Sequence, residues 1–214
     1  MKGLPDPGRR RMTYLNQLRQ LCALGCLMIT FGSFSPTLDA SDADWTVERL
    51  MALVREQRKP SVGFEEAIYS SVLTEPLKAR GVLRFTPPTT LEKLVTDPVQ
   101  ERYVIQGDRV TIENPRKGVT RTLSLGAYPA LRSFVEAFRM SLMGEAAQLK
   151  QLYEVTLEGT PAKWTLLLRP LDLEAKSVLD YLLFTGSDGR ISTIAVRSPD
   201  GDRTVTTLLW GARQ

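Results

Sequence analysis

The side chains that most enzymes use for nucleophilic and acid–base chemistry are scarce in this sequence. The 214 residues include no histidine, and the two cysteines, Cys22 and Cys26, both lie near the N-terminus. The sequence therefore excludes Ser-His and Cys-His nucleophilic systems, histidine general bases and nearly all zinc or iron sites. Chemistry based on carboxylates or lysine stays open, but no pair of carboxylates has a spacing that suggests it. We expect neither an enzyme nor a bound cofactor or metal.

The two Asp-Gly pairs near the C-terminus are better interpreted as turns than as ion sites. Asp188-Gly189 and Asp200-Gly201 resemble fragments of calcium-binding loops, but they lack the spaced carboxylates that such loops need. Each pair separates two runs in which apolar and polar residues alternate, which is typical of a β-hairpin. The sequence therefore predicts a three-stranded meander at the C-terminus.

The positive charge of the chain is concentrated at its N-terminus. The formal net charge is +4, from 28 basic and 24 acidic residues. Residues 1–40 contain five of the basic and two of the acidic residues, which leaves 23 and 22 for the rest of the chain. A nearly neutral remainder gives no reason to expect a phosphate-binding face, so we expect no nucleic-acid partner.

One local stripe of positive charge remains, formed by Lys78, Arg80 and Arg84. It could dock an acidic partner or a lipid headgroup. A solvated outer strand face, or protection of a sheet edge, is the more common role of such a stripe.

The N-terminal segment has the features of a secretory signal peptide. Arg9–Arg11 supply positive charge, and the run from Leu21 to Phe34 is uncharged and apolar. Ala40 and Ala43 offer small residues for cleavage. We expect a signal peptide at residues 1–40, cleavage near 40–43, and export to the periplasm.

Two other interpretations of this segment stay open, a retained N-terminal anchor and a lipoprotein signal at Ala23–Cys26. The uncharged run is short for a membrane span, which needs about twenty residues. Cleavage near 40–43 would leave the mature chain without cysteine, so its domain has to be stabilised by its core alone. We expect residues 44–214 to form one domain.

The mature sequence alternates between strand and helix periods. Between Leu77 and Phe85 every second residue is apolar or small, which predicts a half-buried antiparallel strand. Spacings of three and four predict helices over Asp44–Arg58, with Asp44 as N-cap, and over 131–142. The predicted strands are 64–70, 77–86, 91–96, 101–106, 109–113, 120–125, 153–158, 163–169, 178–185, 190–197 and 203–210. The predicted fold class is α+β, a strongly curved antiparallel sheet of about 9–11 strands, an incomplete β-barrel covered by helices.

This order of elements resembles the LolA-type outer-membrane lipoprotein carriers over Trp45–Leu209. The resemblance rests on the signal peptide, the N-terminal helix, the turns at Pro87-Pro88 and Gly107-Asp108, the helical middle and the final meander. It departs from better-known members at Thr86-Pro87, where they have arginine before proline. It departs again at Arg109–Glu113, which is less aromatic than their equivalent strand. The resemblance implies a periplasmic protein with a helical lid over a cavity that accepts acyl chains.

The alternation and the resemblance together indicate which residues would form the wall and the lid of this cavity. The expected cavity wall is Leu77, Leu83, Phe85, Tyr103, Ile105, Val110, Ile112, Leu166 and Leu168. The expected lid is Leu131, Phe134, Val135, Phe138 and Leu142. From the alternation alone, a filled core is the favoured interpretation of the wall, and a permanently packed helix is as good an interpretation of the lid as a movable one. A register error of one residue would exchange the inner and outer faces of a strand.

The sequence therefore predicts a carrier of an acylated lipoprotein or related lipid that is monomeric and shuttles between membranes. The resemblance implies an inner-membrane exporter as donor and an outer-membrane acceptor. The alternative is a non-catalytic periplasmic sensor or adaptor that acts on a membrane partner. Some relatives of this fold act in that way, but such sensors carry a second domain that we do not expect in this chain.

Overall fold

The computed structural model describes residues 45–211. The predicted signal peptide, its cleavage region and both cysteines lie outside the described residues. Within residues 45–211, no helix has the length and apolar character needed to cross a membrane.

The described residues form a single antiparallel sheet of 11 strands. Its order is β6-β5-β4-β3-β2-β1-β11-β10-β9-β8-β7, so β6 and β7 are the two edges and the sheet does not close. The strands are β1 (Ser61–Tyr69), β2 (Leu77–Thr86), β3 (Thr90–Asp97), β4 (Glu101–Gln106), β5 (Arg109–Asn114), β6 (Val119–Ser124), β7 (Tyr153–Thr160), β8 (Lys163–Pro170), β9 (Tyr181–Ser187), β10 (Arg190–Arg197) and β11 (Arg203–Leu209). The predicted fold class, an open and incomplete barrel covered by helices, is confirmed.

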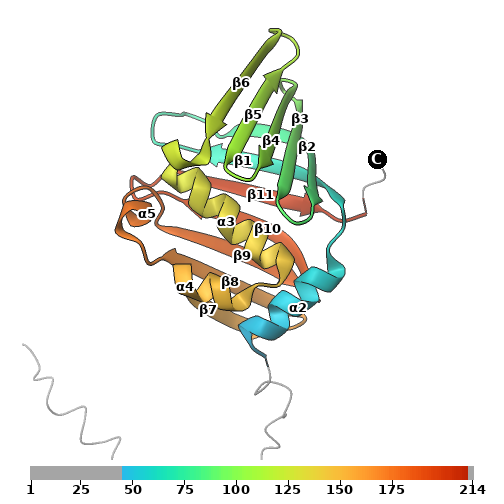
Figure 1. Cartoon of the computed structure of the whole chain (residues 1–214), viewed down its shortest axis with the longest axis vertical. Coiled ribbons are helices and arrows are strands. Elements are labelled where there is room, and N and C mark those ends of the chain that lie inside the picture. The colour runs from blue at the N-terminus through green and yellow to red at the C-terminus, as the bar shows by residue number, and fades with distance from the viewer. Residues whose placement is uncertain (1–44, 212–214) are drawn as a thin grey trace, which may run out of the picture. The chain divides into compact units, whose positions relative to one another are not determined.

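The strand order divides the sheet into two meanders. Strands β1–β6 pair in sequence order, and so do β7–β11. The two meanders join where β1 pairs with β11, from Gly63 opposite Leu209 to Tyr69 opposite Arg203. The chain that leaves edge strand β6 must therefore cross to the opposite edge before β7 begins, and the helical middle of the chain makes this crossing (Figure 1).

The helices lie on one face of the sheet, which we call the inner face (Figure 1). They are α2 (Val47–Gln57), the 3₁₀ turn η1 (Leu125–Ala127), α3 (Pro129–Met143), α4 (Ala146–Leu152) and α5 (Leu173–Val178). Helix α3 begins with Pro129 and is followed by its C-cap Gly144, whose φ of 79° is in the left-handed region. Proline at a helix start and glycine just past its end are favoured because proline lacks the N–H group and glycine lacks a Cβ.

Two helix starts differ from the sequence prediction. The N-cap of α2 is Thr46 rather than Asp44, because the Thr46 hydroxyl accepts the Arg49 N–H at 3.2 Å. Helix α5 was not predicted, although Asp172 accepts the Ala175 N–H at 2.9 Å and is a normal N-cap. With only six residues, α5 is too short to show a helical period.

The densest part of the core lies on the inner face of the second meander. Trp164, Leu166, Leu168, Leu182 and Phe184 are each at most 2% exposed. Full burial of one such side chain is worth roughly 1.5–3 kcal/mol, so this row stabilises the docking of the helices. Gly186 permits the tight packing, because a Cβ there would lie 2.3 Å from the Trp164 ring.

Candidate functional site

A cavity of about 540 Å³ opens between the inner face of the first meander and helix α3. Its volume is typical of small-molecule sites, which occupy about 300–1,000 Å³. Strands β1–β5 supply the floor, α3 lies across it, and Val54 of α2 with Ile191 and Ile194 of β10 complete the wall. The lining is predominantly aliphatic and aromatic, so the cavity suits an apolar ligand.

Most of the predicted wall residues line this cavity. They are Leu83, Phe85, Tyr103, Ile105, Val110 and Ile112. The strand pairing explains their common face, because Phe85 lies opposite Leu91, Leu91 opposite Ile105, and Ile105 opposite Val110. The inner row thus crosses four neighbouring strands in register.

Three predicted wall residues lie elsewhere. Leu77, at the start of β2, is 56% exposed and is not among the lining residues. Leu166 and Leu168 face inward as expected, but they are at most 1% exposed and belong to the filled core of the second meander. Alternation identified the correct face for these two leucines, but it does not reveal whether helices cover that face closely.

Helix α3 turns most of its predicted lid residues toward the cavity. Leu131, Phe134, Phe138 and Leu142 line it, and the Phe134 and Phe138 rings stack with centroids 5.9 Å apart. Val135 is fully buried and is not part of the lining. Val135 belongs instead to the buried core.

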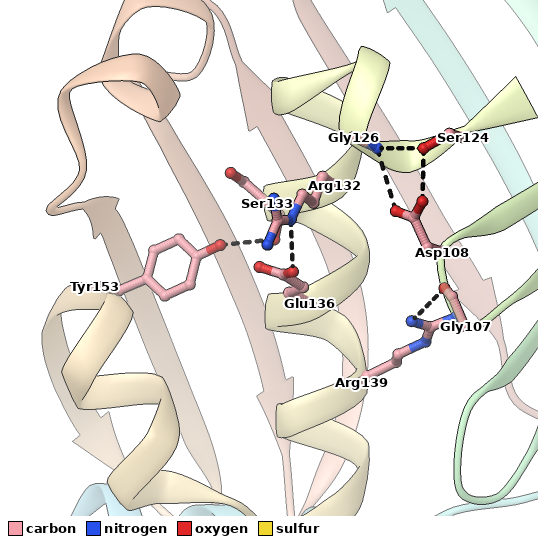
Figure 2. Close-up of polar contacts among 9 residues, drawn as sticks. All are labelled: Gly107, Asp108, Ser124, Gly126, Arg132, Ser133, Glu136, Arg139 and Tyr153. Carbon is pink, nitrogen blue, oxygen red and sulfur yellow. Dashed lines mark hydrogen bonds and ion pairs between the residues drawn. The ribbon is translucent and has the colours of Figure 1, made fainter.

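Two side-chain hydrogen bonds attach α3 to opposite halves of the sheet, as Figure 2 shows. On the side of the second meander, the Tyr153 hydroxyl donates to the Ser133 carbonyl at 2.6 Å. On the side of the first meander, Arg139 Nη1 donates to the Gly107 carbonyl in the β4–β5 turn at 3.1 Å. Burial lowers the pKa of the Arg139 guanidinium, and its Nε and Nη2 atoms are buried without a hydrogen-bond partner among the described residues.

The corner that leads into α3 is fixed by Asp108. Its carboxylate accepts the Ser124 hydroxyl at 2.5 Å and the Gly126 N–H at 3.2 Å (Figure 2). These bonds join the β4–β5 turn to the end of β6 and to η1. They therefore set the direction in which the chain crosses the inner face.

A third attachment comes from Arg58, in the connection between α2 and β1. Arg58 Nη1 donates to the Leu142 carbonyl at 2.9 Å, and its guanidinium lies 5.2 Å from the centre of the Phe85 ring. This chain has threonine rather than arginine before Pro87. The arginine that contacts the end of α3 is instead Arg58.

Polar side chains also line the cavity, and the sequence analysis missed them. Glu66 on β1 and Lys93 on β3 form an ion pair at 2.6 Å, and the Thr206 hydroxyl donates to Glu66 at 2.9 Å. A signal was available, because Glu66 interrupts the inner row Val62, Phe64 and Ile68. The predicted strand began only at Phe64, so this row was too short to show the interruption.

Tyr103, opposite Lys93, adds a hydroxyl beside this pair. It donates to Glu101 at 2.5 Å, and the Asn114 side-chain amide donates to the other Glu101 oxygen at 3.1 Å. Burial and the bond to Glu101 raise the pKa of Tyr103 to about 12. The hydroxyl is therefore protonated at neutral pH. Among residues 45–211, no cluster of acidic, cysteine or histidine side chains could hold a metal ion.

Arg80 and Arg84 of the basic stripe on β2 pair with acidic side chains on the outer face of the sheet, where Arg80 contacts Asp97 at 3.6 Å. Arg84 contacts Glu92 at 3.4 Å, and Arg102 contacts both Glu92 at 2.7 Å and Glu113 at 3.1 Å. The hydrogen bond from Arg102 lowers the pKa of Glu92. This cross-strand ladder fits a solvated sheet face better than a docking site.

Comparison with known proteins adds one match that covers most of the chain. The sequence model of the family described as "Outer membrane lipoprotein carrier protein LolA-like" matches residues 35–214. No curated protein matches the sequence.

Solved structures with similar folds have low sequence identity. The LolA superfamily protein NE2245 from Nitrosomonas europaea is 12% identical with a TM-score of 0.41, over 77% of this chain and 91% of that one. LprF from Mycobacterium bovis is 12% identical with a TM-score of 0.35, over 78% and 94%. The Pseudomonas aeruginosa MucA/MucB complex matches at 11% and 0.40, over 76% of this chain and 55% of that one.

Proposed function

The chain belongs to the family of LolA-like outer membrane lipoprotein carriers, and from that premise we propose that it is a periplasmic carrier of acylated cargo. The acyl chains of a lipoprotein or related lipid enter the cavity beneath α3, and the protein moves them between membranes as a monomer. An inner-membrane exporter supplies the cargo and an outer-membrane acceptor receives it. The function is binding and transfer, without a catalytic step.

The observation that carries this proposal is the apolar cavity of about 540 Å³ in a fold whose other half is filled. Burial contributes about 0.8 kcal/mol per CH₂ group, so one chain of roughly sixteen carbons gains about 10 kcal/mol before the costs of binding. This gain is large enough to hold a lipid in water. Release then needs a competing acceptor or movement of α3.

Lipid analysis of the native protein tests the proposal. The full-length chain is expressed with its own N-terminus, recovered from the periplasm without detergent, and its solvent extract is examined by mass spectrometry. A stoichiometric acylated species supports the carrier and identifies the cargo. A protein that is empty and also fails to take up a fluorescent fatty acyl probe contradicts it, and favours the sensor or adaptor.

A pair of matched variants assigns the bound lipid to the cavity. Ile112→Trp places a large ring in the cavity, whereas Thr111→Trp adds the same ring to the opposite face of the same strand. The first variant should lose the lipid and the second should retain it. Equal lipid content in both folded variants would place the lipid elsewhere.

A further inference from the structure

An ion pair crosses the floor of this otherwise apolar cavity. Lys93 Nζ lies 2.6 Å from one Glu66 oxygen, and the Thr206 hydroxyl donates to the other at 2.9 Å. All three residues line the cavity. The pair therefore places a positive charge within reach of any ligand that fills the site.

The backbone between the partners leaves room for this pair. Glu66 lies opposite Ala79 and Lys93 lies opposite Leu83, so the pair crosses strand β2 at the intervening Gly81. A Cβ at Gly81 would lie 3.0 Å from the Phe64 ring and closer still to a backbone carbonyl of β3. The missing side chain lets Lys93 extend across one strand to reach β1.

The stability of the fold does not explain the pair. The Glu66 side chain is 10% exposed and that of Lys93 is 30% exposed. Removing two charges from water costs free energy that their attraction offsets only in part, and apolar replacements of buried pairs are often neutral or stabilising. Because both partners line the cavity, the pair is in a position to contact a ligand there.

Lys93 has N–H donors that its ion pair does not use. Lys93 has three N–H donors, of which Glu66 accepts one, while the Phe64 ring centre lies 5.1 Å from the ammonium nitrogen. Both carboxylate oxygens of Glu66 already accept a hydrogen bond. Lys93 therefore offers the cavity further N–H donors, while each Glu66 oxygen already has one hydrogen-bond partner.

The charge of this donor is already paired, because Glu66 contacts Lys93 directly at 2.6 Å. The Glu66 carboxylate repels a free carboxylate or phosphate at Lys93 more strongly than it repels a neutral carbonyl oxygen. A neutral acceptor gains the hydrogen bond to Lys93 with less of that repulsion.

We propose that Lys93, positioned by Glu66, binds the carbonyl oxygen of an ester or amide linkage in the cargo, while the attached chain lies beneath α3. This inference rests on the proposed function and narrows it to neutral acyl esters and amides rather than free fatty acids. Diacylglyceryl lipoproteins and phospholipids both contain such linkages, so the chemistry is shared between two sources.

Displacement of a fluorescent fatty acyl probe from the full chain tests the proposal. The competitors are 1-palmitoylglycerol, its ether analogue 1-hexadecylglycerol, which lacks the carbonyl, and palmitate. Wild type should bind the ester roughly tenfold more tightly than the ether, as a hydrogen bond to a charged group predicts, and more tightly than palmitate. Equal affinity for ester and ether, or tighter binding of palmitate, would overturn the proposal.

Two variants assign the preference to Lys93. Lys93→Met should bind ester and ether equally, with the ether affinity unchanged, whereas Lys150→Met should keep the wild-type preference. Lys150 is the matched control because its 2.7 Å pair with Glu48 lies outside the cavity lining. An ester preference that persists in Lys93→Met contradicts the role given to this residue.

A double variant covers the possibility that Lys93→Met leaves Glu66 unpaired and fails to fold. Glu66→Leu combined with Lys93→Met removes both charges and should fold while showing no ester preference. If neither glyceride nor palmitate displaces the probe from wild type, the proposed function itself fails. If both displace it without preference, only the inference fails.

The same assay separates the two sources of the linkage. A synthetic diacylglyceryl-cysteine peptide and a phosphatidylethanolamine with the same chains are compared as competitors. Tighter binding of the lipopeptide, lost in Lys93→Met, assigns the site to lipoproteins. The same result for the phospholipid assigns it to membrane lipid. Insensitivity of both to Lys93→Met counts against the proposal.

Discussion

The two meanders of this sheet have similar alternation but different interiors. On the inner face of the second meander, Trp164, Leu166 and Leu168 are at most 2% exposed. On that of the first, Leu83, Ile105 and Ile112 are only partly buried and line the cavity. The extensive helix–strand contacts are those of α4 with β7, α5 with β8 and α2 with β10. The helices thus pack against one half of the sheet, and α3 spans the other.

This difference indicates that one half of the sheet has a filled core and the other half retains a cavity. The filled core stabilises the fold, so the other half can retain space. The ion pair of Glu66 and Lys93 follows the same division, because it lies on the half that contributes less to the core. Each prediction below compares one position in each half.

Truncation of an inner leucine should have the largest effect and should separate the halves most clearly. Leu168→Ala removes a fully buried side chain and should lower the free energy of unfolding by about 2–5 kcal/mol. Leu83→Ala only enlarges an existing cavity and should cost less than about 1.5 kcal/mol. Urea denaturation of ligand-free protein measures both. Equal costs would mean that the first meander is also a closed core.

The face of each strand could be predicted from the sequence because alternation is a local property. The inner row Leu83, Phe85, Ile105 and Ile112 has the expected orientation. The C-terminal meander of β9, β10 and β11, which the two Asp-Gly turns predicted, is confirmed by the strand order.

What covers each inner face could not be predicted, because it depends on contacts between residues far apart in the sequence. Leu168 and Ile112 occupy similar alternating patterns, yet one is buried by helices and the other faces a cavity. The pairing of Glu66 with Lys93 could not be predicted for the same reason. It requires β1 and β3 to lie on either side of β2, with Gly81 between the two side chains. A charge in an inner row was visible in the sequence, but its partner was not.

Enlargement of an inner side chain should have the next largest effect, again in only one half. Leu182→Phe overpacks the filled core and should cost about 1–3 kcal/mol of unfolding free energy. Ile105→Phe extends into the cavity and should change that free energy by less than about 0.5 kcal/mol. The cavity variant should take up less fluorescent acyl probe at saturation. A large loss of stability in Ile105→Phe would show that the cavity collapses in solution.

The two attachments of α3 should also differ in strength. Tyr153→Phe removes the 2.6 Å bond to the Ser133 carbonyl on the filled side and should cost about 1 kcal/mol. Arg139→Met removes the bond to Gly107, but it also removes two buried nitrogen atoms that have no hydrogen-bond partner within residues 45–211, so the net change should stay within about 0.5 kcal/mol.

Thermal unfolding and hydrogen exchange of the α3 amides measure these two variants. Only Arg139→Met should speed release of an acyl probe without lowering stability, because it frees α3 from the β4–β5 turn alone. If Tyr153→Phe speeds release equally at unchanged stability, then α3 opens from both sides.

The smallest effect concerns two tyrosines, one in each half. Burial is the main cause that raises the pKa of both Tyr103, to about 12, and Tyr153. Folded protein then retains a proton on Tyr103 where unfolded chain, with a pKa near 10.0, has lost it. The stability that Tyr103 contributes is therefore complete below pH 10.0 and is lost as the pH rises toward about 12.

Ligand binding should shift the titration of only one of these tyrosines. Tyr103 lines the cavity, so a bound acyl chain should desolvate its hydroxyl further and raise its pKa, whereas Tyr153 lies outside the lining. Ultraviolet difference titration of wild type, Tyr103→Phe and Tyr153→Phe, with and without 1-palmitoylglycerol, assigns each transition. Glu101→Gln should lower the pKa of Tyr103, because it removes the carboxylate that stabilises the protonated hydroxyl. A ligand-induced shift at Tyr153 instead would place the bound chain in the half of the sheet that the structure fills with side chains.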